Sequence, residues 1–94
     1  MIFVRYLVIY DITDDRLRSR VAEILKNYGL KRIQKSAFIG YLTRSKLSSL
    51  IVDVKLIVVD DNLKIFPLCD IDYKRLISIG KEYREEPEEK VVFY

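Results

Sequence analysis

The order of strand-like and helix-like segments is the feature that most constrains the fold of this chain. Residues 2–10, IFVRYLVIY, are rich in β-branched and aromatic residues, which is typical of a central strand. Thr13 is the expected N-cap of the helix that follows, and Gly29 is the expected residue just beyond its end. Between them, apolar residues recur at helical spacing: Leu17, Val21, Ile24, Leu25 and Tyr28.

The remaining segments complete a recognisable order. Residues 30–42 predict two strands joined by a tight turn near Lys35 and Ser36. Residues 44–57 predict a second helix from the spacing of their apolar residues, and residues 63–69, LKIFPLC, predict a strand that its proline restricts to a sheet edge or a bulge. The order strand, helix, strand, strand, helix, strand predicts an α+β, ferredoxin-like βαββαβ sandwich. In that fold an antiparallel sheet has both helices on one face, and the first strand lies near its centre.

The chain is expected to consist of a ferredoxin-like core, residues 1–69, and a C-terminal extension, residues 70–94. Asp70 and Asp72 fit a loop, and the charged residues 82–90 fit a solvated linker. The chain then ends on VVFY, an extra β-prone strand that needs a sheet edge. This strand could reach its own edge or that of a neighbouring subunit. Exchange between subunits would favour a symmetric homodimer, which would help a domain of 94 residues to be stable.

The composition excludes several classes of active site. The chain has no histidine and one cysteine, so it contains no Ser-His-Asp triad, no histidine base and no structural zinc site. Chemistry would have to come from carboxylates, a hard metal ion or tyrosines. Cys69 is expected to be a small apolar filler. No apolar run approaches the roughly 18 residues of a membrane helix, and no signal peptide is visible, so a cytoplasmic protein without a membrane partner is expected.

The basic charge is concentrated in the first half of the chain. Residues 1–47 carry ten basic and four acidic residues, a net charge of +6, whereas residues 48–94 carry seven and ten, a net charge of −3. A concentrated positive surface attracts polyanions, of which nucleic acid is the commonest. The alternative is a basic protein with no such partner.

Asp11 stands where the first strand meets the first helix, and two interpretations of it stay open. A loop aspartate commonly accepts hydrogen bonds from nearby backbone N–H groups. It could instead be a ligand for Mg²⁺, which keeps several waters and often uses only one or two protein carboxylates plus substrate phosphates. A two-fold axis near this loop would bring a second copy of Asp11 to such a site.

Arginines and lysines follow Asp11 closely. Arg16 and Arg20 share a helix face at spacing i, i+4, while Arg18 points elsewhere. Two like charges on one face slightly destabilise a helix, but beside an aspartate at a helix start they suit a phosphate contact. The candidate nucleic-acid-binding residues are Arg16, Arg18, Arg20, Lys31 and Lys35.

Residues 10–42 resemble the signature of the small CRISPR-associated Cas2 proteins. That signature has Tyr-Asp at a strand end, Asp-Asp-Arg at a helix start, Leu-x-x-Tyr-Gly at a helix end, and a basic-Ile/Val-Gln-x-Ser strand followed by Phe. In this chain the matching residues are Tyr10, Asp11, Asp14, Asp15, Arg16, Leu25, Tyr28, Gly29, Arg32, Ile33, Gln34, Ser36 and Phe38. The segment NLKIFPLC and the terminal VVFY resemble the family's fourth and swapped fifth strands. Gly40 departs from the family pattern, which usually has a larger or acidic residue there.

The resemblance implies a homodimer in which two copies of Asp11 hold a divalent metal, usually Mg²⁺. It implies a metal-dependent endonuclease that cleaves phosphodiester bonds in single-stranded RNA or double-stranded DNA, acting in spacer acquisition and antiviral defence. The catalytic set that it implies is Asp11, Tyr10, Arg18, Arg20, Arg32 and Phe38. The alternative within the family is a non-catalytic dimeric scaffold that binds duplex DNA and bridges subunits of the CRISPR integrase. A ligand-sensing ferredoxin-like regulatory domain is a more remote interpretation.

Overall fold

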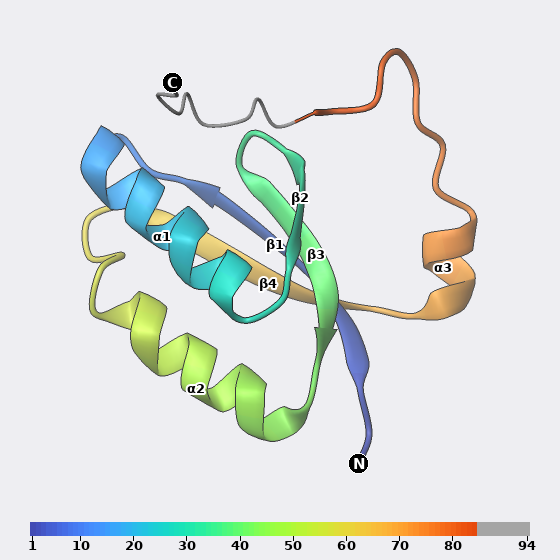
Figure 1. Ribbon diagram of the computed structural model, residues 1–94, viewed down its shortest axis with the longest axis horizontal. Coiled ribbons are helices and arrows are strands. Elements are labelled where there is room, and N and C mark those ends of the chain that lie inside the picture. The colour runs from blue at the N-terminus through green and yellow to red at the C-terminus, as the bar shows by residue number, and fades with distance from the viewer. Residues whose placement is uncertain (85–94) are drawn as a thin grey trace, which may run out of the picture.

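The fold was obtained as a computed structural model, which describes residues 1–84. Seven elements follow one another along the chain (Figure 1). They are β1 (Val4–Asp11), α1 (Asp15–Asn27), β2 (Lys31–Gln34), β3 (Ala37–Leu42), α2 (Arg44–Lys55), β4 (Asn62–Leu68) and α3 (Asp70–Lys74). The predicted order of the first six is confirmed. The expected terminal strand, residues 91–94, lies outside the described residues.

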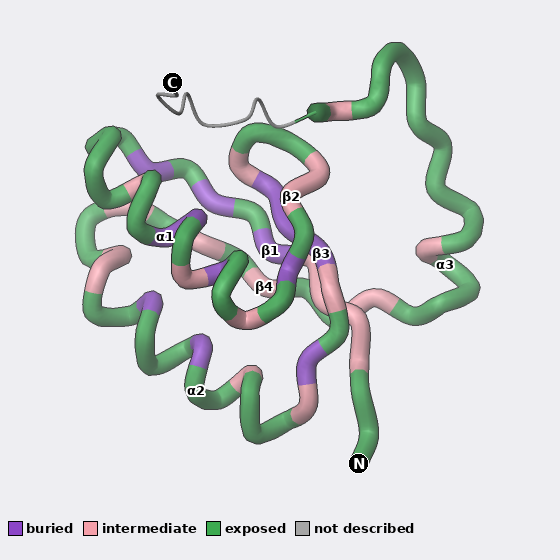
Figure 2. The backbone as a smooth tube through the Cα atoms, viewed as in Figure 1, coloured by how far each residue is buried: buried purple, intermediate pink, exposed green. Residues whose placement is uncertain are grey.

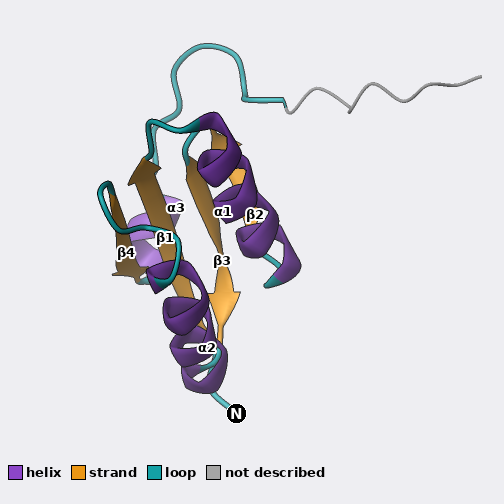
Figure 3. Cartoon of the chain, turned by 90° about the vertical axis from the view of Figure 1, so that its left-hand side faces the viewer, coloured by secondary structure: helices purple, strands orange, loops and turns teal. Residues whose placement is uncertain are grey.

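The four strands form one antiparallel sheet in the order β2-β3-β1-β4. β1 is central, as predicted, and β4 with its Pro67 lies at an edge, where the missing N–H of proline is tolerated. α1 and α2 cover one side of the sheet, and α3 lies on the other side (Figure 3). This is the ferredoxin-like α+β fold that the sequence predicts. No helix among residues 1–84 is long and apolar enough to cross a membrane.

The core fills the space between the sheet and the two long helices. Successive side chains of a strand point to opposite faces, so Val8 and Tyr10 are buried on the helix side while Ile9 and Asp11 are exposed on the other. Buried positions accordingly gather on β1, β3 and the inner sides of α1 and α2 (Figure 2). Leu17, which belongs to the predicted apolar stripe of α1, is 38% exposed and lies outside this core.

The start of α1 differs from the prediction by one residue. The N-cap is Asp14, whose carboxylate Oδ1 accepts a hydrogen bond from the backbone N–H of Leu17 across 3.0 Å. The prediction that Thr13 is the N-cap is therefore wrong. The hydroxyl of Thr13 lies 3.4 Å from Asp61 Oδ1 instead, on the loop before β4. An aspartate next to a threonine offers two capping residues, and sequence alone does not choose between them.

The turn after α1 depends on two glycines. Gly29 has φ +90°, the left-handed conformation that suits a residue after a helix end, as predicted. Gly40 on β3 is required for a steric reason, because a Cβ placed on it would lie 2.6 Å from Cδ2 of Leu30. Leu30 is buried and belongs to the hydrophobic core. The departure of Gly40 from the family pattern thus has a local steric reason.

The face of the sheet that α1 and α2 leave open is largely apolar. Ile9, Tyr41 and Phe66 are exposed there, and Leu7 lies between Ile39 and Phe66 in the strand register. We call these five residues the open face. It is unusual for a small domain to expose a contiguous apolar surface in the middle of its sheet, and such a surface is typical of an interface.

α3 covers only one end of this face, beside the start of β1. Arg5 Nη1 donates to Asp70 Oδ1 across 2.6 Å, and its guanidinium carbon lies 4.6 Å and 3.9 Å from the ring centroids of Tyr41 and Tyr73. The predicted loop around Asp70 is therefore wrong, because these contacts hold a short helix. Cys69 is its N-cap and is exposed, so the expected apolar filler is wrong as well.

Candidate nucleic-acid interface

Asp11 is the last residue of β1 and lies opposite Asn62 on β4. Its carboxylate is exposed and borders a cavity of about 420 Å³, which we call the Asp11 pocket. The turn between β2 and β3 forms another wall, and the backbone N–H of Tyr10 donates to the carbonyl of Ser36 across 3.1 Å to fix it. The lining residues are Asp11, Ile12, Arg18, Ser19, Arg32, Lys35, Ser36 and Tyr83.

Arg18 is held in this pocket by the backbone before α1. Its Nη1 donates to the carbonyl oxygens of Ile12 at 2.9 Å and Thr13 at 3.3 Å, and its Nη2 forms an ion pair with Asp15. The side chain is 39% exposed, so part of the guanidinium still meets solvent. A planar, pre-oriented guanidinium next to a carboxylate is well suited to a phosphate group.

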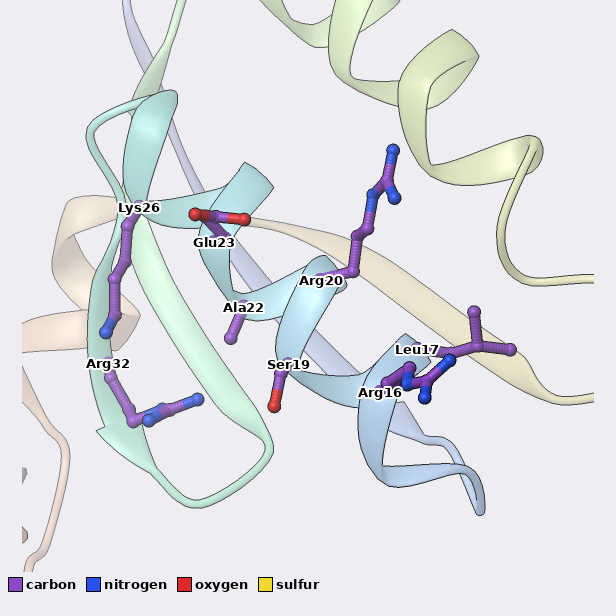
Figure 4. A pocket seen from close by; sticks show the side chains of 8 residues that line it. All are labelled: Arg16, Leu17, Ser19, Arg20, Ala22, Glu23, Lys26 and Arg32. Carbon is purple, nitrogen blue, oxygen red and sulfur yellow. The ribbon is translucent and has the colours of Figure 1, made fainter.

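A second and larger cavity, of about 720 Å³, runs along the outer side of α1 towards β2 (Figure 4). We call it the α1 groove. Among the described residues that line it, four side chains are cationic and one, Glu23, is anionic. Lys26 and Arg32 lie along one side, while Arg20 extends from the helix towards α2 (Figure 4). Its lining residues are Arg16, Leu17, Ser19, Arg20, Ala22, Glu23, Lys26 and Arg32.

The structure thus divides the predicted basic cluster between two cavities. Arg18 lines the Asp11 pocket together with Lys35, whereas Arg16 and Arg20 line the α1 groove, which confirms that Arg18 points away from them. Arg20 does not line the pocket of Asp11, so the two arginines expected to act together there are separated. Lys31 precedes Arg32 on β2, and strand alternation places the two on opposite faces of the sheet.

Two of the implied catalytic residues are aromatic and lie in the core. Phe38 is 0% exposed and Tyr10 is 5% exposed, and their rings stack with centroids 6.3 Å apart. The guanidinium carbon of Arg32 lies 5.0 Å from the Phe38 ring centroid. In this chain the buried ring of Phe38 therefore packs against the guanidinium of Arg32. A direct role for the ring of Tyr10 or Phe38 in the reaction stays a prediction.

Comparison with known proteins identifies the family. The profile of the family described as CRISPR associated protein Cas2 matches residues 4–76. The chain belongs to the Cas2 family. A CRISPR-associated endoribonuclease Cas2 from Korarchaeum cryptofilum is 48% identical over 79 residues, which cover 82% of this chain and 85% of that protein.

Two further relatives bear on the fold and on assembly. The crystal structure of a hypothetical protein, TT1823, from Thermus thermophilus has a TM-score of 0.74 and 32% identity, and the match covers 89% of this chain and 99% of that one. A protein from Thermoproteus tenax, named a fusion of endonuclease Cas1 and endonuclease Cas2, is 56% identical over 36 residues. These cover 38% of this chain and 14% of the fusion.

The magnesium ion that membership of the Cas2 family implies can be tested against the donor atoms present. No group of three or more His, Cys, Asp or Glu side chains within residues 1–84 could hold a metal ion. Asp11 is the one acidic residue among those described that line its pocket. Its carboxylate oxygens are suitable Mg²⁺ ligands and are exposed at the border of the open face. The donor set therefore fits an ion that Asp11 holds together with water, substrate phosphates or the carboxylate of a second copy of the chain, and it does not form a cage of three or more such side chains within residues 1–84.

Sequence reasoning on this Cas2 family member missed four polar residues of the two cavities, which are Ser19, Glu23, Lys26 and Tyr83. Ser19 and Lys26 lie seven residues apart on α1, so they share a helix face, and this spacing could have revealed them. Tyr83 reaches the Asp11 pocket from the C-terminal extension. It lies far from Asp11 along the chain, and no local pattern indicates that the two come together.

Proposed function

We propose that this chain is a Mg²⁺-dependent endonuclease that cleaves phosphodiester bonds in single-stranded RNA, with double-stranded DNA as a second substrate, in CRISPR spacer acquisition and antiviral defence. One observation carries the proposal: Asp11 is exposed at the end of the central strand, in a pocket whose other charged residues, among those that the structure describes, are Arg18, Arg32 and Lys35. The name of the Korarchaeum relative, an endoribonuclease, supports the reaction class.

The basic residues of the pocket would bind and orient the substrate. Arg18 offers N–H groups in a fixed fork, and Arg32 and Lys35 add positive charge from β2 and the turn after it. These cations would stabilise the negative charge that develops on the phosphate oxygens as the bond is cleaved. The two copies of Asp11 would hold Mg²⁺, which when bound polarises the phosphate and lowers the pKa of water. With no histidine in the chain, no imidazole is present to act as the base.

The dimer that this function requires would form through the open face. Burying Ile9, Tyr41 and Phe66 against the same residues of a second copy would remove apolar surface from water, which contributes roughly 25 cal/mol per Å². Asp11 borders this surface at the end of β1, so a two-fold axis there would bring two carboxylates together. The exchange of residues 91–94 between the subunits remains part of the proposal.

A nuclease assay with Asp11→Asn tests the reaction. The purified variant and the wild type are incubated with labelled single-stranded RNA and duplex DNA, with Mg²⁺ or with EDTA. We expect wild-type cleavage only with Mg²⁺, and none by the variant. Asp72→Asn, which removes an exposed carboxylate from α3, is the matched control and should cleave normally. Full cleavage by Asp11→Asn in EDTA would refute the proposal.

The second candidate function is a scaffold that binds duplex DNA and bridges integrase subunits. The α1 groove favours it, because its cations could bind backbone phosphates without any part in cleavage. The Cas1 and Cas2 segments of the Thermoproteus fusion support a Cas1 protein as partner. If Asp11→Asn binds DNA normally and supports spacer integration by a Cas1 partner, the scaffold is the biological function. Loss of integration in that variant would exclude a purely architectural role.

A further inference from the structure

The α1 groove has properties that the Asp11 pocket lacks. It is the larger of the two cavities, and Glu23 is the one anion among its described lining residues, against Arg16, Arg20, Lys26 and Arg32. None of its described lining residues is a carboxylate at a strand end, so none of them is a counterpart of Asp11. Such a cavity suits binding of anionic groups and offers no arrangement for hydrolysis.

The chemistry of the groove favours the nucleic-acid backbone over the bases. Its floor consists of the short side chains of Ser19 and Ala22, and the described lining residues include no aromatic ring on which a base could stack (Figure 4). Cationic side chains on both rims of a groove without such a platform track phosphates in a sequence-independent way.

The groove also continues into the Asp11 pocket. Ser19 and Arg32 line both cavities, so they stand at the junction between the two. Arg32 approaches from β2 and Ser19 from α1, and Figure 4 shows both side chains directed into the space between these elements. A strand whose phosphate occupied the Asp11 pocket could therefore continue past the junction into the α1 groove.

We propose that the α1 groove is a second nucleic-acid subsite, which binds the backbone phosphates flanking the phosphodiester held in the Asp11 pocket. The inference rests on the proposed function, since it assumes that the pocket takes nucleic acid. Arg20 and Lys26 line this subsite and do not line the Asp11 pocket, and Glu23 weakens the subsite by repulsion of phosphate. The subsite would hold a long substrate in place and would contribute nothing to the binding of a very short one.

The test compares two double variants that remove the same charge. Arg20→Gln/Lys26→Gln alters the groove, and Arg44→Gln/Lys46→Gln removes one arginine and one lysine from the exposed start of α2. All variants carry Asp11→Asn so that the RNA stays intact. Binding of a long single-stranded RNA and of a trinucleotide is measured by fluorescence anisotropy over a series of salt concentrations.

We expect Arg20→Gln/Lys26→Gln to lower affinity for the long RNA about tenfold and to reduce the slope of log affinity against log salt by about 1.4, since each of the two lost phosphate contacts removes roughly 0.7 from the slope for single strands. Affinity for the trinucleotide should not change. Glu23→Gln should raise affinity for the long RNA, and the α2 control should leave both affinities near those of the parent.

Equal effects of the two double variants would overturn the subsite, and so would an equal loss on the long RNA and the trinucleotide. Both results would mean that only overall charge matters. Neither would affect the proposed function, which is judged by cleavage with Asp11→Asn alone. Arg18→Gln separates the two cavities further, because it should weaken binding of the trinucleotide as well as the long RNA.

Discussion

The guanidinium of Arg18 donates a hydrogen bond to the backbone carbonyl of Ile12 across 2.9 Å, and this bond ties the first turn of α1 to the residue that follows Asp11. The guanidinium of Arg18 is therefore held at a fixed position relative to Asp11, since it is hydrogen-bonded to the chain segment that carries Asp11. Pre-organisation of this kind lets a charged group act on a phosphate without first having to be ordered.

Arg18→Lys tests this anchoring. Lysine keeps the charge but has a single ammonium group, which cannot bond two carbonyls and still present a planar fork. We expect the rate of RNA cleavage to fall about 10- to 100-fold. This is at or below the loss that follows complete removal of one hydrogen-bond donor that stabilises the charge of a transition state. The substitution Arg44→Lys is the control in kinetic assays of both variants. An unchanged rate for Arg18→Lys would mean that its charge alone suffices.

Gly40→Ala tests the contact with Leu30. The added methyl group would meet Cδ2 of Leu30 at 2.6 Å, so we expect a loss of roughly 1–3 kcal/mol in the free energy of unfolding. Leu30→Ala alone should cost about 2–5 kcal/mol, because it leaves a cavity.

The double variant Gly40→Ala/Leu30→Ala should lose less than the sum of the two single losses, because the alanine methyl partly fills the space that leucine leaves. Urea unfolding of all four proteins gives the coupling. Strict additivity would show that these two residues do not limit each other.

Phe66→Asp tests the open face as the dimer interface. A carboxylate buried between two apolar sheets would be strongly unfavourable, so we expect analytical ultracentrifugation to find a monomer for the variant and a dimer for the wild type. Loss of cleavage should accompany it, since Asp11 would lose its second copy. Val52→Asp, at a 59% exposed position on α2, is the matched control. A Phe66→Asp dimer as tight as the wild type would place the interface elsewhere.

The substitution Tyr28→Phe is expected to change how the free energy of unfolding depends on pH. The hydroxyl of Tyr28 donates to Asp53 Oδ2 across 2.6 Å and joins the end of α1 to α2. This hydrogen bond, with smaller effects of burial and of the Asp53 charge, raises the pKa of Tyr28 above its ordinary value of 10.0. Because the pKa is raised on folding, the stabilisation is complete below pH 10.0 and is lost as the pH rises through the folded pKa.

The wild type should therefore resist urea better than Tyr28→Phe near pH 8, and the difference should shrink as the pH rises above 10.0 through the folded-state pKa of Tyr28. Chemical unfolding of both proteins across this pH range measures it. A constant difference at every pH would contradict a role for the phenol proton.

The main elements could be predicted because their signals are local. The apolar spacing of α1, the glycine after its end and the proline of β4 each report on a few neighbouring residues. α3 escaped prediction because it is held by Arg5, which lies at the other end of the core in sequence, and a five-residue helix has little periodicity to detect.

The candidate site was predicted only in part for the same reason. Asp11 and the arginines of α1 lie in one continuous segment, so their proximity follows from the strand–helix order. Their division between two cavities depends on where β2 passes α1, and this places Arg32 at the junction. Tyr83 reaches the pocket through the extension, and such a long-range contact leaves no trace in local spacing.

The alternation of side chains along β1 makes the fold and the chemistry inseparable. Tyr10 is buried in the core and Asp11 is exposed to solvent, although the two residues are adjacent in the chain. An insertion or deletion of a single residue within this strand would exchange their environments, forcing an acid inward and a phenol outward. Homologues that tolerate length changes should therefore carry them in the loops, and directed evolution that seeks new activity would do best to leave the length of this strand untouched.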